Sequence, residues 1–144
     1  MRFDPGRYAA ENYPDWRIKS LALGGAHAIS VRARRTVFVE RTLSRAQWDE
    51  SVAHEFCHMD RDDEKTVTCW HERKQEQACW RDTARLMIGL DDLVSAWQWV
   101  GPCIESVAEE LGRTSALVRV RLDALHPSER GALRLALSMK GEVA

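Results

Sequence analysis

At residues 52–59 the chain reads V-A-H-E-F-C-H-M, and this stretch decides how the rest is interpreted. It contains the pattern His-Glu-x-x-His, which is a zinc-binding motif when it lies on a helix. At about 100° per residue, His54 and His58 lie about 40° apart on the helix surface, so both imidazoles can reach one ion. Glu55 lies about 60° further round, where it can hold a water at an open metal position. The stretch therefore predicts a helix that carries a zinc site.

The same helix has a second, apolar face. Trp48, Val52, Phe56 and Met59 cluster more than about 100° from the midpoint of the two histidines. One stripe can therefore pack on a core while the other faces a metal site. The alternative is a pair of surface histidines on an ordinary amphipathic helix.

A third ligand is expected from a second helix over residues 72–88. Glu76 lies on the same stripe as Trp80, with Lys74, Arg81 and Arg85 on the opposite side. A carboxylate on an inward apolar stripe is costly unless it is paired or bound to metal. Glu76 is therefore the natural third ligand, which leaves one coordination position open. Glu72, one turn earlier, and His71 compete for this role, and a site with no third protein ligand also stays possible.

Length and charge limit the classes of protein that fit. A chain of 144 residues suits a single domain, here residues 1–144. The net charge of −1 argues against a protein held to nucleic acid by bulk electrostatics. No apolar run is long enough to cross a bilayer, and the N-terminus lacks the pattern of a signal peptide. We therefore expect no membrane partner and a cytoplasmic location.

The four cysteines show no C-x-x-C pairing and no disulfide framework, which fits a reducing compartment. They are interpreted as small buried apolar residues. Cys57 and Cys79 lie where they could approach the metal, and both are kept as less favoured ligands.

The N-terminal part predicts a small antiparallel sheet of about three strands. Residues 1–15 are interpreted as an irregular lead-in. Three β-prone runs follow, at 16–23, 27–32 and 35–40, of which the last is the strongest. A further edge strand is expected at 65–70, from its β-branched and aromatic residues.

Helices are expected over most of the remaining chain. Residues 44–47 (S-R-A-Q) form a capping box, so the helix of the motif should begin there and run to about Met59. Residues 90–100 predict a packing helix with Trp97 and Trp99 in the core. The expected fold is α+β, with the small sheet packed against a mostly helical body.

The C-terminal segment, residues 104–144, has a pattern similar to a helix-turn-helix. Two amphipathic helices meet at Gly112, and a third follows. Arg113, Arg119 and Arg121 could contact phosphate groups. Acidic and basic residues are equal in number over this segment, which predicts weak DNA binding. A DNA-binding or regulatory module is therefore an alternative function.

With both halves of the site placed, the chain resembles the ImmA/IrrE-type metallo-endopeptidases over most of residues 16–135. The resemblance rests on the motif at 52–58 and on Glu76, which is followed at the family's spacing by A-R-L-M-I at 84–88. It also rests on A-E-E-L…R-L-D-A-L…P-S-E-R at 108–130, which looks like the C-terminal segment of short actinobacterial or actinophage members. Trp80 departs from the family, where a small polar or acidic residue is frequent.

The resemblance implies that His54, His58 and Glu76 hold Zn²⁺ and that Glu55 activates water. It implies an endopeptidase whose partner is a protein substrate, a helix-turn-helix repressor that is cleaved to switch on mobile-element or stress genes. A second alternative is a zinc-bound but inactive anti-repressor scaffold, although such a scaffold has no need of a base beside an open position. The group that stabilises the oxyanion is not identified, and its candidates are His27, His71, Tyr8 and Tyr13.

Overall fold

The structure is a computed structural model that describes residues 2–62 and 69–140. Within these ranges the chain forms seven α-helices and one three-stranded sheet, which confirms the expected α+β class. The chain divides into two compact units, Phe3–Thr83 and Ala84–Ala144, and the second also includes Arg2. No helix in the described ranges is long and apolar enough to cross a membrane.

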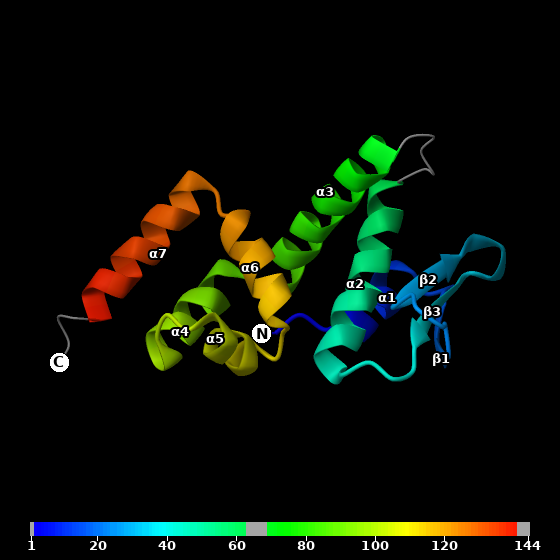
Figure 1. Ribbon diagram of the computed structural model, residues 1–144, viewed down its shortest axis with the longest axis horizontal. Helices are drawn as coiled ribbons and strands as arrows, with labels where there is room; N and C mark the ends of the chain where they lie inside the picture. The colour runs from blue at the N-terminus through cyan, green and yellow to red at the C-terminus, as the bar shows by residue number, and fades with distance from the viewer. Residues whose placement is uncertain (1, 63–68, 141–144) are drawn as a thin grey trace. The chain divides into compact units, whose positions relative to one another are not determined.

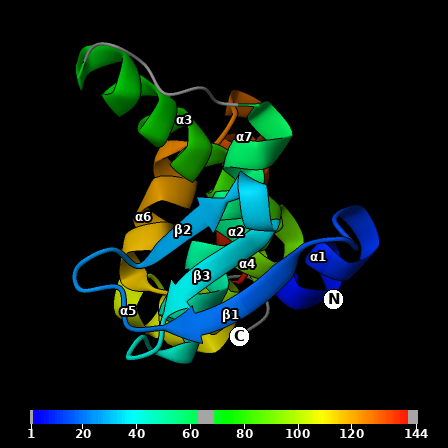
Figure 2. The ribbon, with the colours of Figure 1, turned by 90° about the vertical axis from the view of Figure 1, so that its right-hand side faces the viewer.

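The sheet of the first unit is mixed, so the expectation of an antiparallel sheet is wrong. Its strands are β1 (Arg17–Leu21), β2 (Ala28–Val31) and β3 (Thr36–Glu40), in the order β1-β3-β2. Figure 2 shows β3 between the other two, where it runs parallel to β1 and antiparallel to β2. The chain reverses once after β1 and again at Arg35, which has a φ of 44°. Two reversals restore the direction of β1, so β3 must be parallel to β1 when the two are neighbours.

The central place of β3 agrees with its composition. Thr36, Val37 and Val39 are buried, whereas most residues of β1 are exposed. A central strand loses solvent on both of its edges, so the strand with the strongest run of β-branched and aromatic residues is stabilised most in that position.

The N-terminal lead-in contains a helix, which corrects the prediction of irregular structure over residues 1–15. Helix α1 spans Pro5–Asn12, and Asp4 caps it by accepting hydrogen bonds from the amides of Gly6 and Arg7. Aspartate at the N-cap followed by proline in the first turn is a helix-start signal. The abundance of proline and glycine in this stretch concealed that signal.

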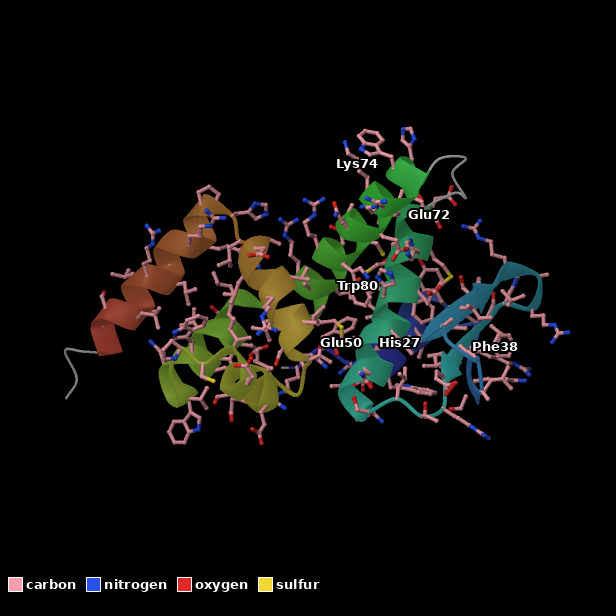
Figure 3. The ribbon with its side chains drawn as sticks, in the orientation of Figure 1. His27, Phe38, Glu50, Glu72, Lys74 and Trp80 are labelled. Carbon is pink, nitrogen blue, oxygen red and sulfur yellow. The ribbon has the colours of Figure 1, made fainter. Side chains whose placement is uncertain are left out.

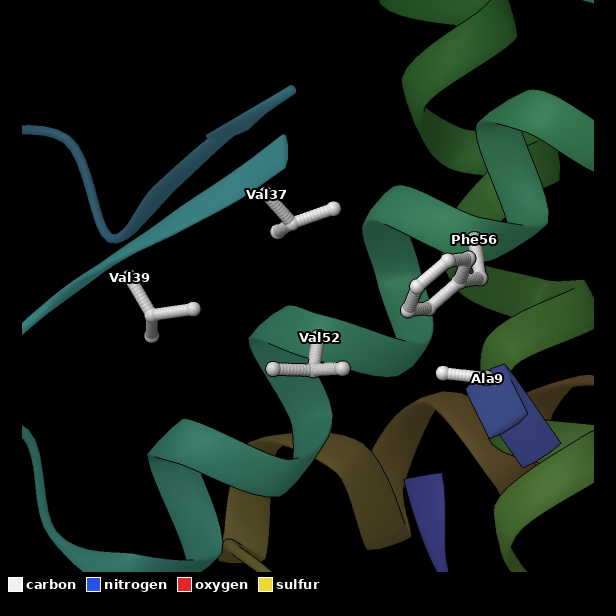
Figure 4. Packing of buried hydrophobic residues seen from close by; sticks show 5 residues of the cluster. All are labelled: Ala9, Val37, Val39, Val52 and Phe56. Carbon is white, nitrogen blue, oxygen red and sulfur yellow. The ribbon is translucent and has the colours of Figure 1, made fainter. Parts of the chain in front are cut away.

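The motif lies on the long helix α2 (Arg45–Arg61), whose capping box is confirmed. Ser44 accepts from the amide of Gln47, and the Gln47 side chain accepts from the amide of Ser44. One face of α2 packs on the sheet and on α1, and Figure 4 shows the buried side chains at this contact. They are Ala9, Val37, Val39, Val52 and Phe56. The apolar stripe expected for the motif helix thus does form core.

Helix α3 (Cys69–Met87) belongs to the first unit as far as Thr83, and this part of it runs beside α2 (Figure 1). Arg61 of α2 donates a hydrogen bond of 2.9 Å to Asp82 of α3. Residues 65–68 of the expected edge strand lie outside the described residues, and the last two residues of that stretch begin α3. The second helix of the site therefore starts a few residues earlier than expected.

The second unit contains helices only, apart from turns, in its described residues. They are α4 (Leu90–Val100), α5 (Ile104–Leu111), α6 (Ser115–Asp123) and α7 (Pro127–Lys140), and α4 packs on both α5 and α7. The expectation that Trp99 is in the core is wrong, because its side chain is largely exposed. Trp97 and Trp99 are about 200° apart on a helix, so one inward face cannot take both.

Two buried arginines link separate segments of the second unit through hydrogen bonds. Arg113 donates to the carbonyl of Met87, and Arg121 donates to the carbonyl of Ile88 at 2.7 Å. Arg121 also donates twice to Glu129, at 3.3 and 2.6 Å, and only 3% of its side chain is exposed. The last carbonyls of a helix have no amide partner within the helix, and a guanidinium group can donate hydrogen bonds to them. The same guanidinium can also pair with a carboxylate.

We expect the replacement Glu129→Gln to destabilise the protein at about pH 7 by roughly 2 kcal/mol. The hydrogen bonds from Arg121 lower the pKa of Glu129 to about 2 from its ordinary value of 4.5. The ion pair therefore stabilises the folded state fully above pH 4.5, and this contribution is lost as the pH falls toward 2. Urea unfolding followed by circular dichroism measures the effect.

The difference between wild type and variant should shrink to less than half by about pH 3. Glu109→Gln, an exposed carboxylate on α5, is the matched control and should change little at either pH. A loss of stability in Glu129→Gln that is the same at both pH values would contradict the role of the ion pair.

Candidate metal centre

Helix α2 directs the two motif histidines toward α3. His54 is buried, and 22% of the His58 side chain is exposed. The two imidazole rings lie 4.6 Å apart between centroids, in an edge-to-face arrangement. The i, i+4 spacing on a helix produces this proximity, as the sequence predicts.

Glu76 on α3 contacts both histidines. One of its carboxylate oxygens lies 3.0 Å from Nε2 of His54, and the other lies 2.6 Å from Nε2 of His58. Nearly half of the Glu76 side chain is exposed, so solvent reaches the point where the three groups meet. The structure therefore brings together the three residues for which zinc ligation was predicted.

The competing ligands lie elsewhere. Glu72 is exposed, and Figure 3 shows it nearer the start of α3 than Trp80. His71 is also exposed, and its ring stands edge-on to Trp70 at 4.9 Å.

Cys79 belongs to the same cluster. Its sulfur and one ring nitrogen from each of His54 and His58 all lie within 4.8 Å of one another, so these three residues could hold a metal ion. The thiol is completely buried and donates a hydrogen bond to the carbonyl of His54 at 3.4 Å. Cys57 is buried as expected, whereas Cys103 is exposed, which contradicts the prediction for that residue.

Trp80 forms one wall of the centre. Its ring stacks on the imidazole of His54, with centroids 3.9 Å apart and an interplanar angle of 14°. The contact fixes the orientation of the imidazole, because a stacked ring pair resists rotation about the side-chain bonds. The large residue at this position thus packs on His54 and supports its ring.

Glu55 lies beside the cluster and contacts the sheet. Burial raises the pKa of Glu55, a hydrogen bond with Ser30 lowers it, and the nearby charges of His58 and Glu76 act in opposite directions. The net shift is upward, so this carboxyl binds a proton more readily than an exposed glutamate does. A carboxyl of this kind is suited to proton transfer.

Two of the candidates for oxyanion stabilisation are bound to another residue. The hydroxyls of Tyr8 and Tyr13 both donate to the carboxylate of Asp60, near the end of α2. Burial and this hydrogen bond raise the pKa of Tyr13 to about 12 and that of Tyr8 further. The two phenols therefore tie α1 and the segment after it to α2. His27 and His71, the two remaining candidates, are exposed.

The arginines proposed as phosphate contacts are engaged in the fold. Arg113 and Arg121 are buried, so for these two the expectation is wrong. Arg119 forms an ion pair of 3.1 Å with Glu105. Two helices joined at Gly112 are present as predicted, but two of the three arginines are buried, and the exposed Arg119 is paired with a carboxylate. This arrangement does not favour the DNA-binding alternative.

Two residues near the centre were not anticipated from the sequence. Ser30 reaches Glu55 from β2, and nothing in the local pattern of that strand signals this contact. Glu50 is a buried carboxylate one turn before His54 on α2. Its spacing of four residues before the first histidine was a signal that it shares the inward side of the helix.

Comparisons of the chain with protein-family models, with curated proteins and with solved structures return no match. The resemblance found in the sequence therefore stays a prediction. The case for a function depends on the geometry of the centre.

Proposed function

We propose that the protein is a zinc-dependent endopeptidase. The observation that carries the proposal is the position of Glu76, whose two carboxylate oxygens reach Nε2 of His54 and Nε2 of His58. A solvent-exposed surface histidine pair would not have a carboxylate from a second helix directed at both rings. Two imidazoles and one carboxylate form the ligand set of several zinc peptidases.

The distances suit a zinc ion. Ligands at about 2.0–2.1 Å in a tetrahedral arrangement stand about 3.3 Å from one another. The nitrogen–oxygen distances of 3.0 and 2.6 Å are shorter than that value by about 0.3 and 0.7 Å. Small side-chain rotations would thus convert the hydrogen-bonded cluster into a coordination sphere.

Glu55 is the proposed general base. A zinc ion at this centre would polarise the peptide carbonyl and lower the pKa of water. Glu55 would take a proton from the attacking water and deliver it to the leaving amine. Its partial burial and its contact with Ser30 hold the carboxyl next to the histidines, where these transfers must occur.

Strand β2 offers a place for an extended peptide. In the described part of the chain it pairs with β3 and with no other strand, so its second edge is open to another chain. Ser30 of β2 contacts Glu55, which puts this edge within a side-chain length of the base. A peptide that added to β2 would bring a backbone carbonyl to the centre.

The proposed substrate is a helix-turn-helix repressor in the cytoplasm, which is the substrate class that the resemblance implies. Its cleavage would switch on mobile-element or stress genes. An inactive zinc-bound anti-repressor scaffold is the remaining alternative, and it differs from the proposal only in catalysis.

Incubation of the zinc-loaded protein with a panel of helix-turn-helix repressors, and with casein as an unfolded substrate, tests the proposal. We expect discrete fragments from at least one protein, loss of cleavage with a chelator, and recovery on addition of zinc. Zinc-loaded protein that cleaves nothing in the panel, both as wild type and as Cys79→Ala, would favour the scaffold.

A further inference from the structure

Helix α3 brings two donors of different chemistry to the centre. Glu76 and Cys79 are three residues apart, so they lie on one face of the helix about one turn from each other. Pairs at this spacing bind a shared metal site in helical carboxylate proteins. The same face of α3 could therefore supply an oxygen and a sulfur to one ion.

The sulfur is close enough to take part. In a tetrahedral zinc site, sulfur at about 2.3 Å and nitrogen at about 2.0 Å from the metal stand about 3.6 Å apart. The sulfur of Cys79 lies within 4.8 Å of a ring nitrogen of each histidine, which is at most about 1.2 Å longer than this separation. Its present partner, the carbonyl of His54 at 3.4 Å, is a weak one that metal binding would replace.

We propose that Cys79 is the fourth ligand of the resting centre, together with His54, His58 and Glu76. This inference rests on the proposed zinc site. Cys79 loses its proton when it binds, and the donor set becomes softer than that of a His2Glu site. Such a set prefers zinc, cobalt or cadmium to magnesium or calcium.

The fourth ligand has a consequence for catalysis. Catalytic zinc sites keep one position open, whereas sites with four protein ligands are closed. With Cys79 bound, water and substrate have no place at the metal, so the resting protein is latent. Cleavage requires the sulfur to leave, and Cys79 regains a proton when it does.

Cobalt(II) substitution tests the assignment directly, because thiolate bound to cobalt absorbs strongly in the near ultraviolet. We expect this band in the wild type and in Cys57→Ala, and its loss in Cys79→Ala. Cys57 is the matched control, since it is also buried and lies beside His58 on α2 but is not part of the cluster. Cleavage per bound zinc ion should rise in Cys79→Ala.

X-ray absorption of the zinc-loaded wild type gives the same answer without a variant that could fail to fold. A sulfur at about 2.3 Å supports the proposal. One bound metal ion with nitrogen and oxygen neighbours alone would overturn it and leave the His2Glu site intact. A band lost in Cys57→Ala and kept in Cys79→Ala would also overturn it. Failure to bind any metal would remove the proposed function itself and this inference with it.

Discussion

Glu55→Gln should bind zinc as the wild type does and lose cleavage by a factor of roughly 10² to 10⁴. Glutamine has nearly the same shape and can still hydrogen-bond to Ser30, so the fold and the ligands should be undisturbed. The amide cannot accept the proton of the attacking water or pass one to the leaving amine. The change therefore removes proton transfer and little else.

The measurement is the rate of substrate cleavage at equal bound zinc, with Glu72→Gln as the control. Glu72 is an exposed carboxylate on α3, so its replacement should leave the rate unchanged. Cleavage by Glu55→Gln at the wild-type rate would exclude Glu55 as the base. Zinc-bound protein that has no measurable activity, both as wild type and as Cys79→Ala, would instead indicate the scaffold.

The second large effect is expected from Glu76→Ala, which should weaken zinc binding. Loss of a partner outside the coordination sphere costs roughly 10- to 100-fold in affinity, and loss of a ligand should exceed that. Glu76 contacts both histidines, so the variant also leaves the two imidazoles without the group that joins them across the helices. Competition with a chromogenic chelator gives the dissociation constant.

Glu72→Ala separates the two glutamates of α3 that the sequence leaves in competition. We expect its zinc affinity to stay close to that of the wild type, because Glu72 is exposed. Equal affinity in Glu76→Ala and wild type would exclude Glu76 as a ligand. The remaining histidines and Cys79 would then be the donors to examine.

Local signals in the sequence predict the helices well. The capping box at Ser44 marks the start of α2, and the side-chain pattern around Glu76 predicts most of α3. These signals act over one or two helical turns, so they can be read without the rest of the fold. The convergence of His54 and His58 follows from helix geometry in the same way.

The order of the strands in the sheet and the burial and contacts of the charged residues could not be predicted in this way. Whether β3 lies beside β1 or beyond β2 depends on how the whole chain covers the sheet, and strand composition alone does not determine it. Nothing in the local sequence distinguishes Arg121 from an exposed arginine. It is stabilised in a buried position because it donates hydrogen bonds to the carbonyl of Ile88 and to the carboxylate of Glu129. Contacts such as that of Ser30 with Glu55 likewise join segments far apart in the chain.

The zinc content of the freshly purified wild type tests the central claim most directly. Elemental analysis should find one zinc ion per chain, or the metal-free protein should take up one on titration. In His54→Ala the ion should be lost or held weakly, since one of the two motif ligands is gone. A wild type that contains no zinc and binds none on titration would contradict the account, and the motif would then be a pair of helix histidines joined by a carboxylate.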